Sequence, residues 1–106
     1  MWKLSTPDAS ETDPFTFRLM PGSVKTLGRA TRADFVVDAP LVSRFHCRFT
    51  VHTDGVLELE DLGSTNGTFV NDERITKLVL KPGDRVRAGR VELLVARAES
   101  GVEAAV

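Results

Sequence analysis

Short hydrogen-bonding side chains gather around glycines in the segment 61–71, which reads DLGSTNGTFVN. Its hydroxyl and amide residues are Ser64, Thr65, Asn66 and Thr68, placed around Gly63 and Gly67. Glycine permits backbone turns that other residues resist, and short polar side chains hydrogen-bond readily within such turns. The segment is too polar for a core strand and too specific for a flexible linker. We therefore interpret it as a loop that presents outward-pointing hydrogen-bonding groups.

Two further groups of residues precede this loop. Gly28 and Arg29 stand at the end of an expected strand, and the run Ser43-Arg44-Phe45-His46 comes just before another. Arginine keeps its proton and offers a planar fork of donors, while serine and threonine supply neutral hydroxyl donors. Local positive potential in a nearly neutral chain suits one small, doubly charged ligand. An arginine, hydroxyls and an amide on a rigid frame form the set of groups that such a ligand needs.

The order of these motifs resembles the forkhead-associated (FHA) domain. Gly28-Arg29, then Ser43 and His46 separated by two residues, then the Ser64–Thr68 run follow one another within about forty residues. The resemblance extends over residues 24–96. It implies an FHA module that binds phosphothreonine peptides and so performs phosphorylation-dependent protein–protein recognition. It also implies that the module is not an enzyme and needs no cofactor or metal.

The resemblance assigns roles to individual residues. The phosphothreonine-binding set that it implies is Arg29, Ser43, Arg44, Thr65 and Asn66. Residues expected to support the site structurally are Gly28, His46, Gly67 and Thr68. Asn66 is expected to pair with the main chain of the ligand, because its amide both donates and accepts. The loop 38–42, which lacks Lys and Arg, is expected to help select the ligand residue three positions after the phosphothreonine.

Catalytic and metal-binding alternatives use some of the same residues. Ser43, His46 and Asp61 could suggest a hydrolase triad, but no Gly-x-Ser-x-Gly turn surrounds the serine. A metal site at His46, Cys47 and His52 is disfavoured, since neighbouring residues of a strand point to opposite faces. We expect Cys47 to fill the core rather than to react.

Composition limits the class of protein. The chain has 106 residues, a net charge of −1 and a pI near 6.1, values that fit one domain and do not favour nucleic-acid binding. No apolar run approaches the roughly 20 residues of a membrane span, and no signal peptide opens the chain. A single cysteine excludes an internal disulfide. We expect a soluble, monomeric, cytoplasmic protein, or a nuclear one if it is eukaryotic, whose partner is marked by a Ser/Thr kinase.

Short alternating segments with frequent turn signals predict an all-β sandwich. By resemblance it has two antiparallel sheets of about eleven strands, with the recognition loops at one end. Expected strands lie at 2–4, 15–19, 24–27, 35–37, 46–51, 56–61, 69–70, 74–75, 79–80, around 86 and at 91–96. Asp54-Gly55 and Asn71-Asp72 are expected turns, and Asp72 is expected to bring a negative charge near the peptide groove.

The domain is expected to cover residues 1–98, with 99–106 as a flexible tail or the start of a linker. One alternative function remains open: a phosphate-independent scaffold or dimerisation module that uses a sheet face. Exposed apolar residues along 91–95 would favour this alternative.

Overall fold

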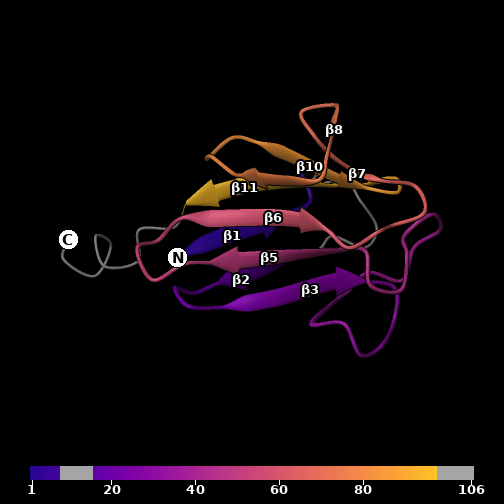
Figure 1. Ribbon diagram of the computed structural model, residues 1–106, viewed down its shortest axis with the longest axis horizontal. Coiled ribbons are helices and arrows are strands. Elements are labelled where there is room, and N and C mark those ends of the chain that lie inside the picture. Colours follow the sequence, from indigo (N-terminus) through magenta and orange to yellow (C-terminus); the bar gives the residue numbers. More distant parts are fainter. Residues whose placement is uncertain (8–15, 98–106) are drawn as a thin grey trace.

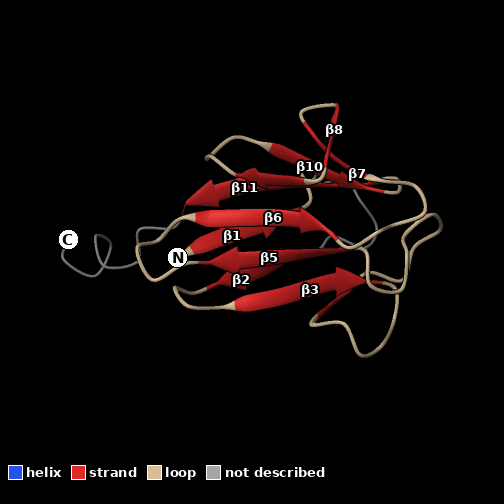
Figure 2. Ribbon diagram, viewed as in Figure 1, coloured by secondary structure: helices blue, strands red, loops and turns tan. Residues whose placement is uncertain are grey.

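Two β-sheets packed face to face form the fold (Figures 1 and 2). The computed structural model describes residues 1–7 and 16–97. Eleven strands lie in these ranges, and no helix does. They are β1 (Trp2–Ser5), β2 (Thr16–Leu19), β3 (Val24–Gly28), β4 (Phe35–Val36), β5 (Cys47–Val51), β6 (Leu57–Asp61), β7 (Thr68–Val70), β8 (Glu73–Ile75), β9 (Lys77–Val79), β10 (Arg85–Ala88) and β11 (Val91–Arg97). The predicted all-β sandwich is confirmed.

The strand order places β8 and β9 at edges of different sheets. One sheet has six strands in the order β2-β1-β11-β10-β7-β8, and the other has five in the order β4-β3-β5-β6-β9. Every pairing is antiparallel except β3 with β4, which are parallel through Leu27 opposite Phe35 and Gly28 opposite Val36. The expected antiparallel arrangement therefore holds for every other pair of the described strands. Strand β4 lies at the loop end of the sandwich, because it pairs with the last residues of β3 and β3 ends there.

Alternation of apolar and polar residues explains the central strands. On β5, Cys47, Phe49 and Val51 are buried, and on β6 the same holds for Leu57 and Leu59. Phe49 pairs with Leu59 across the two strands, so the apolar residues share one face. Side chains on a strand alternate between faces, so the polar residues between them lie on the outer surface. The alternation that predicted these strands therefore separates core residues from surface residues on both of them.

The core lies between the inner faces of the two sheets. Its fully buried members include Leu4, Leu19, Leu27, Val37, Phe49, Leu57, Leu59, Val86, Leu93 and Val95. Phe17 stacks on Phe35 with ring centroids 4.3 Å apart, and this pair joins β2 to β4 at one side of the sandwich. Aromatic pairs of this kind add roughly 0.5–1.5 kcal/mol beyond the burial of their area.

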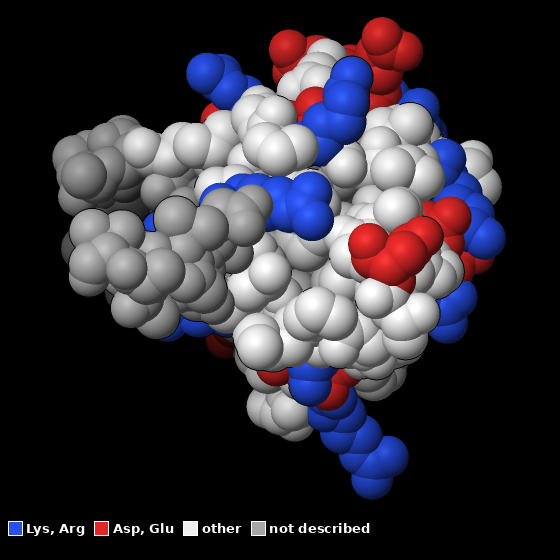
Figure 3. All heavy atoms as spheres, turned by 90° about the vertical axis from the view of Figure 1, so that its left-hand side faces the viewer, with Lys and Arg blue, Asp and Glu red and all other residues white. Residues whose placement is uncertain are grey.

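The loops that carry the sequence motifs meet at one end of the sandwich. Strands β3 and β6 end there and β5 begins there, at the right of Figure 1. The segment 29–46, which contains β4, and the loop 62–67 therefore extend from the same end. The opposite end, seen in Figure 3, shows Lys and Arg interspersed with Asp and Glu in the part that the described residues form.

Several boundaries differ from those expected. Strand β5 begins at Cys47 rather than at residue 46, and β9 covers 77–79 rather than 79–80. Asn71 and Asp72 both adopt positive φ, at 51° and 70°, as a tight hairpin turn requires. At the other expected turn only Gly55 does so, with φ of 91°. Residue 15 and the expected tail at 99–106 lie outside the described residues.

Strand β11, where exposed apolar residues would have favoured a scaffold function, exposes none in the segment 91–95. Leu93 and Val95 of β11 are buried in the core, while Val91 and Leu94 are half-buried. No exposed apolar surface lies along 91–95, so this observation does not favour the scaffold alternative. Within the described residues, no helix is present that could cross a membrane.

Candidate functional site

A hollow of about 350 Å³ opens where the loops meet. It is lined by Arg29, Pro40, Leu41, Val42, Ser43, Thr65 and Asn66. Four of the five residues expected to bind phosphothreonine therefore lie around one concave surface, although 36 positions separate Arg29 from Thr65 in the sequence. The fifth, Arg44, is exposed and is not part of the lining.

Arg29 is held in place by the loop that carries Ser43. Its backbone N–H donates to the Ser43 carbonyl at 2.9 Å, and its side-chain Nε donates to the Val42 carbonyl at 3.0 Å. The Nε bond uses one donor of the guanidinium and leaves the two terminal nitrogens as donors. A guanidinium oriented in this way presents a cation with a fixed geometry to an anionic ligand.

Ser43 connects the two loops through its side chain. The hydroxyl oxygen of Ser43 accepts a 3.0 Å hydrogen bond from the backbone N–H of Thr65. A serine hydroxyl that accepts one bond still has its own proton to donate. Because the Thr65 N–H is engaged, the group that Thr65 offers to a ligand is its exposed side-chain hydroxyl.

Asn66 braces the loop that precedes Ser43. Its Nδ2 donates to the Leu41 carbonyl at 3.0 Å. Leu41 has φ of 71°, a conformation that costs a non-glycine residue energy and that the surrounding structure must impose. Gly89 packs behind it, since a Cβ there would lie 3.0 Å from Leu41 backbone carbon and Pro40 oxygen. The amide of Asn66 keeps its Oδ1 and a second N–H for a ligand.

His46 is a buried structural residue. Its side chain is fully buried, Nδ1 accepts from the Ser43 backbone N–H at 3.0 Å, and Nε2 lies 2.8 Å from the Gly67 carbonyl. These partners assign the neutral tautomer with the proton on Nε2. Both nitrogens bond to backbone groups, so neither is placed to take a proton from the Ser43 hydroxyl. The geometry lacks the base-to-nucleophile contact of a hydrolase triad.

Asp61 organises the glycine-containing loop. One carboxylate oxygen accepts from the hydroxyls of Ser64 at 2.5 Å and Thr68 at 2.6 Å. The other accepts from the backbone N–H groups of Gly63 at 3.0 Å and Ser64 at 3.1 Å. Although partial burial acts to raise it, these hydrogen bonds hold the pKa of Asp61 below its ordinary value. Asp61 is thus an internal anchor for the loop that carries Thr65 and Asn66.

Two glycines allow backbone segments to approach closely. A Cβ at position 28 would lie 1.9 Å from the Arg44 carbonyl oxygen, so only glycine fits between β3 and the Ser43 loop. Gly67 has φ of 88°, and a Cβ there would lie 2.9 Å from Nε of Arg74. Its N–H bonds to the Ser64 hydroxyl at 3.0 Å. Gly28 and Gly67 were expected to support the site, and these contacts show why both positions need glycine.

Asp72 and Cys47 are not part of the hollow. Asp72 lies in the β7–β8 turn and is not among the residues that line the hollow. Its neighbour Asn71 lines a different hollow, beside β8 and β9. Asp72 therefore does not lie at the hollow, because the turn is separated from the loop end by the length of β7, and its effect on a bound peptide stays a prediction. Cys47 is buried in the core, and burial raises the pKa of its thiol.

The roles of Leu41, Val42 and Ser64 were not predicted from the sequence. Leu41 and Val42 contribute backbone carbonyls, which accept from Asn66 and Arg29. Every residue has a backbone carbonyl whatever its side chain, so the residue type could not indicate which carbonyls act as acceptors here. Ser64 was noted as a polar residue, but its bond to Asp61 depends on a turn that the sequence does not show. Within the described residues, no three His, Cys, Asp or Glu residues lie together as a metal site would require.

Comparison with known families agrees with this arrangement. The sequence model of the FHA domain matches residues 25–89, which include every residue named for the hollow. The chain belongs to the FHA-domain family. This FHA domain is 42% identical over 81 residues to the ABC transporter ATP-binding/permease protein Rv1747 of Mycobacterium tuberculosis, and the match covers 76% of this chain. It is 40% identical over 76 residues, 72% of this chain, to the oxoglutarate dehydrogenase inhibitor of Corynebacterium diphtheriae.

The first match covers 9% of the length of the mycobacterial transporter, and the second covers 52% of the length of the corynebacterial inhibitor.

Solved structures resemble this FHA domain over nearly its whole length. A structure from work on phosphothreonine-dependent FHA domain interactions has a TM-score of 0.77 and 32% identity, covering 92% of this chain and 96% of that chain. The FhaA FHA domain, solved in complex with the intracellular domain of Rv3910, has a TM-score of 0.78 and 34% identity, covering 90% and 99%.

Proposed function

We propose that this FHA domain recognises a partner protein by binding a phosphothreonine-containing peptide in the hollow at its loop end. The observation that carries the proposal is the convergence of the Arg29 guanidinium, the Ser43 hydroxyl, Thr65 and Asn66 on one open surface. A solved relative from work on phosphothreonine-dependent FHA interactions supports the choice of ligand. The domain acts as an adaptor that links a phosphorylation event to protein assembly.

Each group of the hollow has a distinct task. The terminal nitrogens of Arg29 pair with the doubly charged phosphate, and the Ser43 and Thr65 hydroxyls donate to its remaining oxygens. Asn66 pairs with the peptide main chain. Arg44, which is exposed one residue beyond Ser43, is assigned an outer contact with the phosphate or the peptide backbone. Gly28, His46, Gly67 and Thr68 hold these groups in place through the contacts described above.

The domain performs no chemistry on its ligand. Both ring nitrogens of His46 are engaged with backbone groups, and the Asp61 carboxylate bonds within its own loop. The partner is a protein phosphorylated by a Ser/Thr kinase. The domain works as a monomer. Its location is the cytoplasm, where such kinases find ATP. Two relatives are named as an inhibitor and a regulator, which supports a regulatory role.

The test is an oriented phosphothreonine peptide library, screened beside the same library without phosphate and with phosphoserine. We expect binding only to phosphorylated peptides, with phosphothreonine preferred. One buried methyl group contributes roughly 1 kcal/mol by transfer alone. Equal binding of the unphosphorylated library contradicts the proposal.

A pair of arginine variants then assigns the site. Arg29→Ala removes one partner of a charge pair, a loss on the order of 2–5 kcal/mol, so affinity falls by more than tenfold. Arg32→Ala changes an exposed arginine of the same loop that does not line the hollow, and it is expected to leave affinity unchanged. Calorimetry measures both, and melting curves check that the fold persists. Equal affinity of Arg29→Ala and the unaltered domain removes Arg29 from the site.

A further inference from the structure

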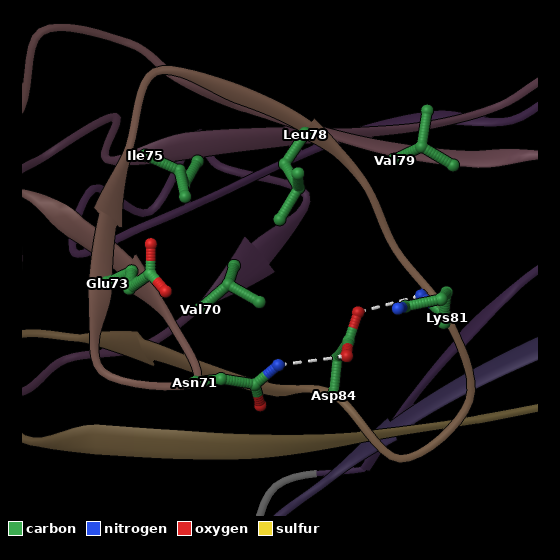
Figure 4. Close-up of a pocket in the computed structure, with 8 residues that line it drawn as sticks. All are labelled: Val70, Asn71, Glu73, Ile75, Leu78, Val79, Lys81 and Asp84. Atoms are coloured by element: carbon green, nitrogen blue, oxygen red, sulfur yellow. Dashed lines mark hydrogen bonds between the residues drawn. The ribbon is translucent and has the colours of Figure 1, made fainter.

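A second and larger hollow lies on the side of the sandwich between β8 and β9. Its volume is about 510 Å³, and it is lined by Val70, Asn71, Glu73, Ile75, Leu78, Val79, Lys81 and Asp84. Figure 4 shows the side chains of Val70, Ile75 and Leu78 pointing into it. The opposite side of the sandwich is closed by the stacked pair Phe17 and Phe35. Stacked aromatic rings therefore fill one side of the space between the two sheets, and an aliphatic hollow opens on the other side.

The floor of this hollow is fixed by hydrogen bonds. Asp84 is buried, and its carboxylate accepts from Asn71 Nδ2 at 3.0 Å and from the Lys81 backbone N–H at 2.8 Å (Figure 4). Asn71 Oδ1 in turn accepts from the Arg85 backbone N–H at 3.0 Å. The hollow is therefore built on a rigid, satisfied polar base rather than on a loose loop.

Strand β9 forms the rim of the hollow and the edge of its sheet. The Asp61 N–H bonds to the Thr76 carbonyl at 2.9 Å, and the Leu80 N–H bonds to the Leu57 carbonyl at 2.8 Å. Backbone groups of an edge strand alternate between the neighbouring strand and the open side. This register directs the N–H and C=O groups of Lys77 and Val79 away from β6, toward the open side.

All three residues of β9 are exposed, including Leu78 at 38% and Val79 at 51%. An edge strand with open backbone groups is a template for an added strand, and natural proteins usually protect such edges. Strand addition gains affinity from main-chain hydrogen bonds and specificity from pockets that accept alternate side chains. The β9 edge supplies the hydrogen-bonding groups and the adjoining hollow supplies the pocket.

We propose that the β9 edge binds an extended segment of a partner protein, which adds antiparallel to β9 and inserts one aliphatic side chain into the hollow. In this register the segment exchanges hydrogen bonds with Val79 and Lys77, and its central residue lies opposite Leu78. Side chains opposite each other on paired strands share a face. Because Leu78 points into the hollow, so does the central residue of the segment (Figure 4).

Charge at the two ends of the hollow sets the direction of the segment. Glu73 lies at one end and Lys81 at the other (Figure 4), both are exposed, and neither forms an ion pair with another described residue. Glu73 is on the side from which β9 begins, and Lys81 follows its end. An antiparallel segment therefore starts near Lys81 and ends near Glu73. The matching pattern is an acidic residue, any residue, an aliphatic residue, any residue and a basic residue.

The size of the edge favours a peptide segment over a second copy of the domain. A three-residue strand is about 10 Å long, whereas stable interfaces between folded proteins bury about 1,200–2,000 Å². Two rigid sandwiches in contact only at β9 would bury much less area than that. An extended segment follows the edge and reaches into the hollow without such a requirement.

The test uses the peptide acetyl-Glu-Thr-Val-Thr-Lys-amide, titrated to millimolar concentration into the isotopically labelled domain. We expect NMR shifts centred on the amides of Lys77, Leu78 and Val79, with slower hydrogen exchange at Lys77 and Val79. The charge-reversed peptide, with Lys first and Glu last, is expected to bind about tenfold more weakly. No shift at these amides, or shifts centred on the hollow lined by Arg29, overturns the proposal.

Two N-methylated peptides provide a matched control. N-methylation of the first threonine removes an N–H that faces β9, and it is expected to weaken binding by about tenfold, the loss of a backbone hydrogen bond with added crowding. N-methylation of the valine restricts the peptide similarly but removes an N–H that faces away from β9, so affinity changes by less than about threefold by the same reasoning. Equal effects of the two modifications contradict strand addition.

Protein variants complete the test. Leu78→Ser removes an apolar wall of the hollow and is expected to abolish peptide binding, while Val24→Ser, at an exposed valine of β3, leaves it unchanged. Leu78→Ser leaves phosphopeptide binding at the loop end unchanged, which separates the two sites. Protection of the Lys77 and Val79 amides from hydrogen exchange is also measured without peptide. If this protection rises with protein concentration, the edge pairs with a second copy of the domain, and the proposal is overturned.

Discussion

The hydroxyl oxygen of Ser43 accepts a hydrogen bond from the backbone N–H of Thr65, and this 3.0 Å contact joins two loops 22 residues apart. It has a chemical consequence as well as a structural one. With its oxygen engaged as an acceptor, the Ser43 hydroxyl directs its proton elsewhere, and it lines the hollow together with Arg29. The same bond holds the Thr65 side chain beside the site.

Replacement of Ser43 by alanine is expected to weaken phosphopeptide binding by roughly tenfold or more. The variant removes a donor to a charged group, worth about 1.5–3 kcal/mol, and it frees the Thr65 N–H. Because Thr65 is exposed, water replaces the lost acceptor and stability changes little. Calorimetry with a phosphothreonine peptide measures the affinity, and Ser23→Ala, in the turn before β3, is the control. Unchanged affinity would show that Ser43 has only a loop-joining role.

Replacement of His46 by alanine is expected to destabilise the fold by about 2–4 kcal/mol. The change leaves a cavity and removes the partners of the Ser43 N–H and the Gly67 carbonyl. Binding weakens only as a result of the altered loops. Urea denaturation measures the loss, and His52→Ala, at an exposed histidine 3.4 Å from Glu58, is expected to have little effect. Unchanged stability combined with lost binding would make His46 a ligand contact.

Asp61 is expected to make stability depend on pH in the acidic range. Its pKa in the folded state is lowered by hydrogen bonds, so its contribution is complete above the unfolded value of about 3.9 and is lost as pH falls through the folded value. Asp61→Asn is expected to cost about 1–2 kcal/mol at neutral pH and to flatten the acid dependence. Thermal melts from neutral pH to below pH 3 measure both effects, with exposed Asp38→Asn as the control. Parallel pH profiles for Asp61→Asn and the unaltered domain would contradict this role.

The sequence predicted those parts of the structure that depend on local alternation or on local turn chemistry. Leu57 and Leu59 are buried as the period of two requires, and the Asn71-Asp72 turn has the positive φ values that these residues tolerate. Both features are decided by neighbours within a few residues. The parallel pairing of β4 with β3 is different, because a strand of two residues carries too little pattern to show its partner.

The residue types of the site could be predicted from the sequence, but the contacts between these residues could not. The motifs indicated Arg29, Ser43, Thr65 and Asn66, and the structure places all of them around one hollow. The bonds that orient them are long-range and often end on backbone carbonyls, as in Asn66 to Leu41 across 25 positions. The position of Asp72 relative to the hollow could not be predicted for the same reason. Its distance from the hollow depends on strand pairing, which sequence neighbours do not reveal.

The loop before Ser43 is expected to favour an aliphatic ligand residue three positions after the phosphothreonine. Pro40 and Leu41 line the hollow, Leu41 is 47% exposed, and the Asn66 bond to its carbonyl holds its backbone in place. No Lys or Arg lies in the segment 38–42 to attract a carboxylate. Burial of an aliphatic side chain against Leu41 is expected to favour it over aspartate by about 1–2 kcal/mol.

Two variants at Leu41 separate side-chain contact from loop shape in that preference. Leu41→Gly removes the apolar wall but suits φ of 71°, so the aliphatic preference is lost while the melting temperature changes little. Leu41→Lys keeps a long side chain but adds a cation, so aspartate becomes the favoured residue. A phosphothreonine peptide array that varies this one position measures all three proteins. Aspartate favoured by the unaltered domain would contradict the prediction and indicate that Arg44 or Arg74 reaches over the ligand, because the loop itself carries no cation to attract it.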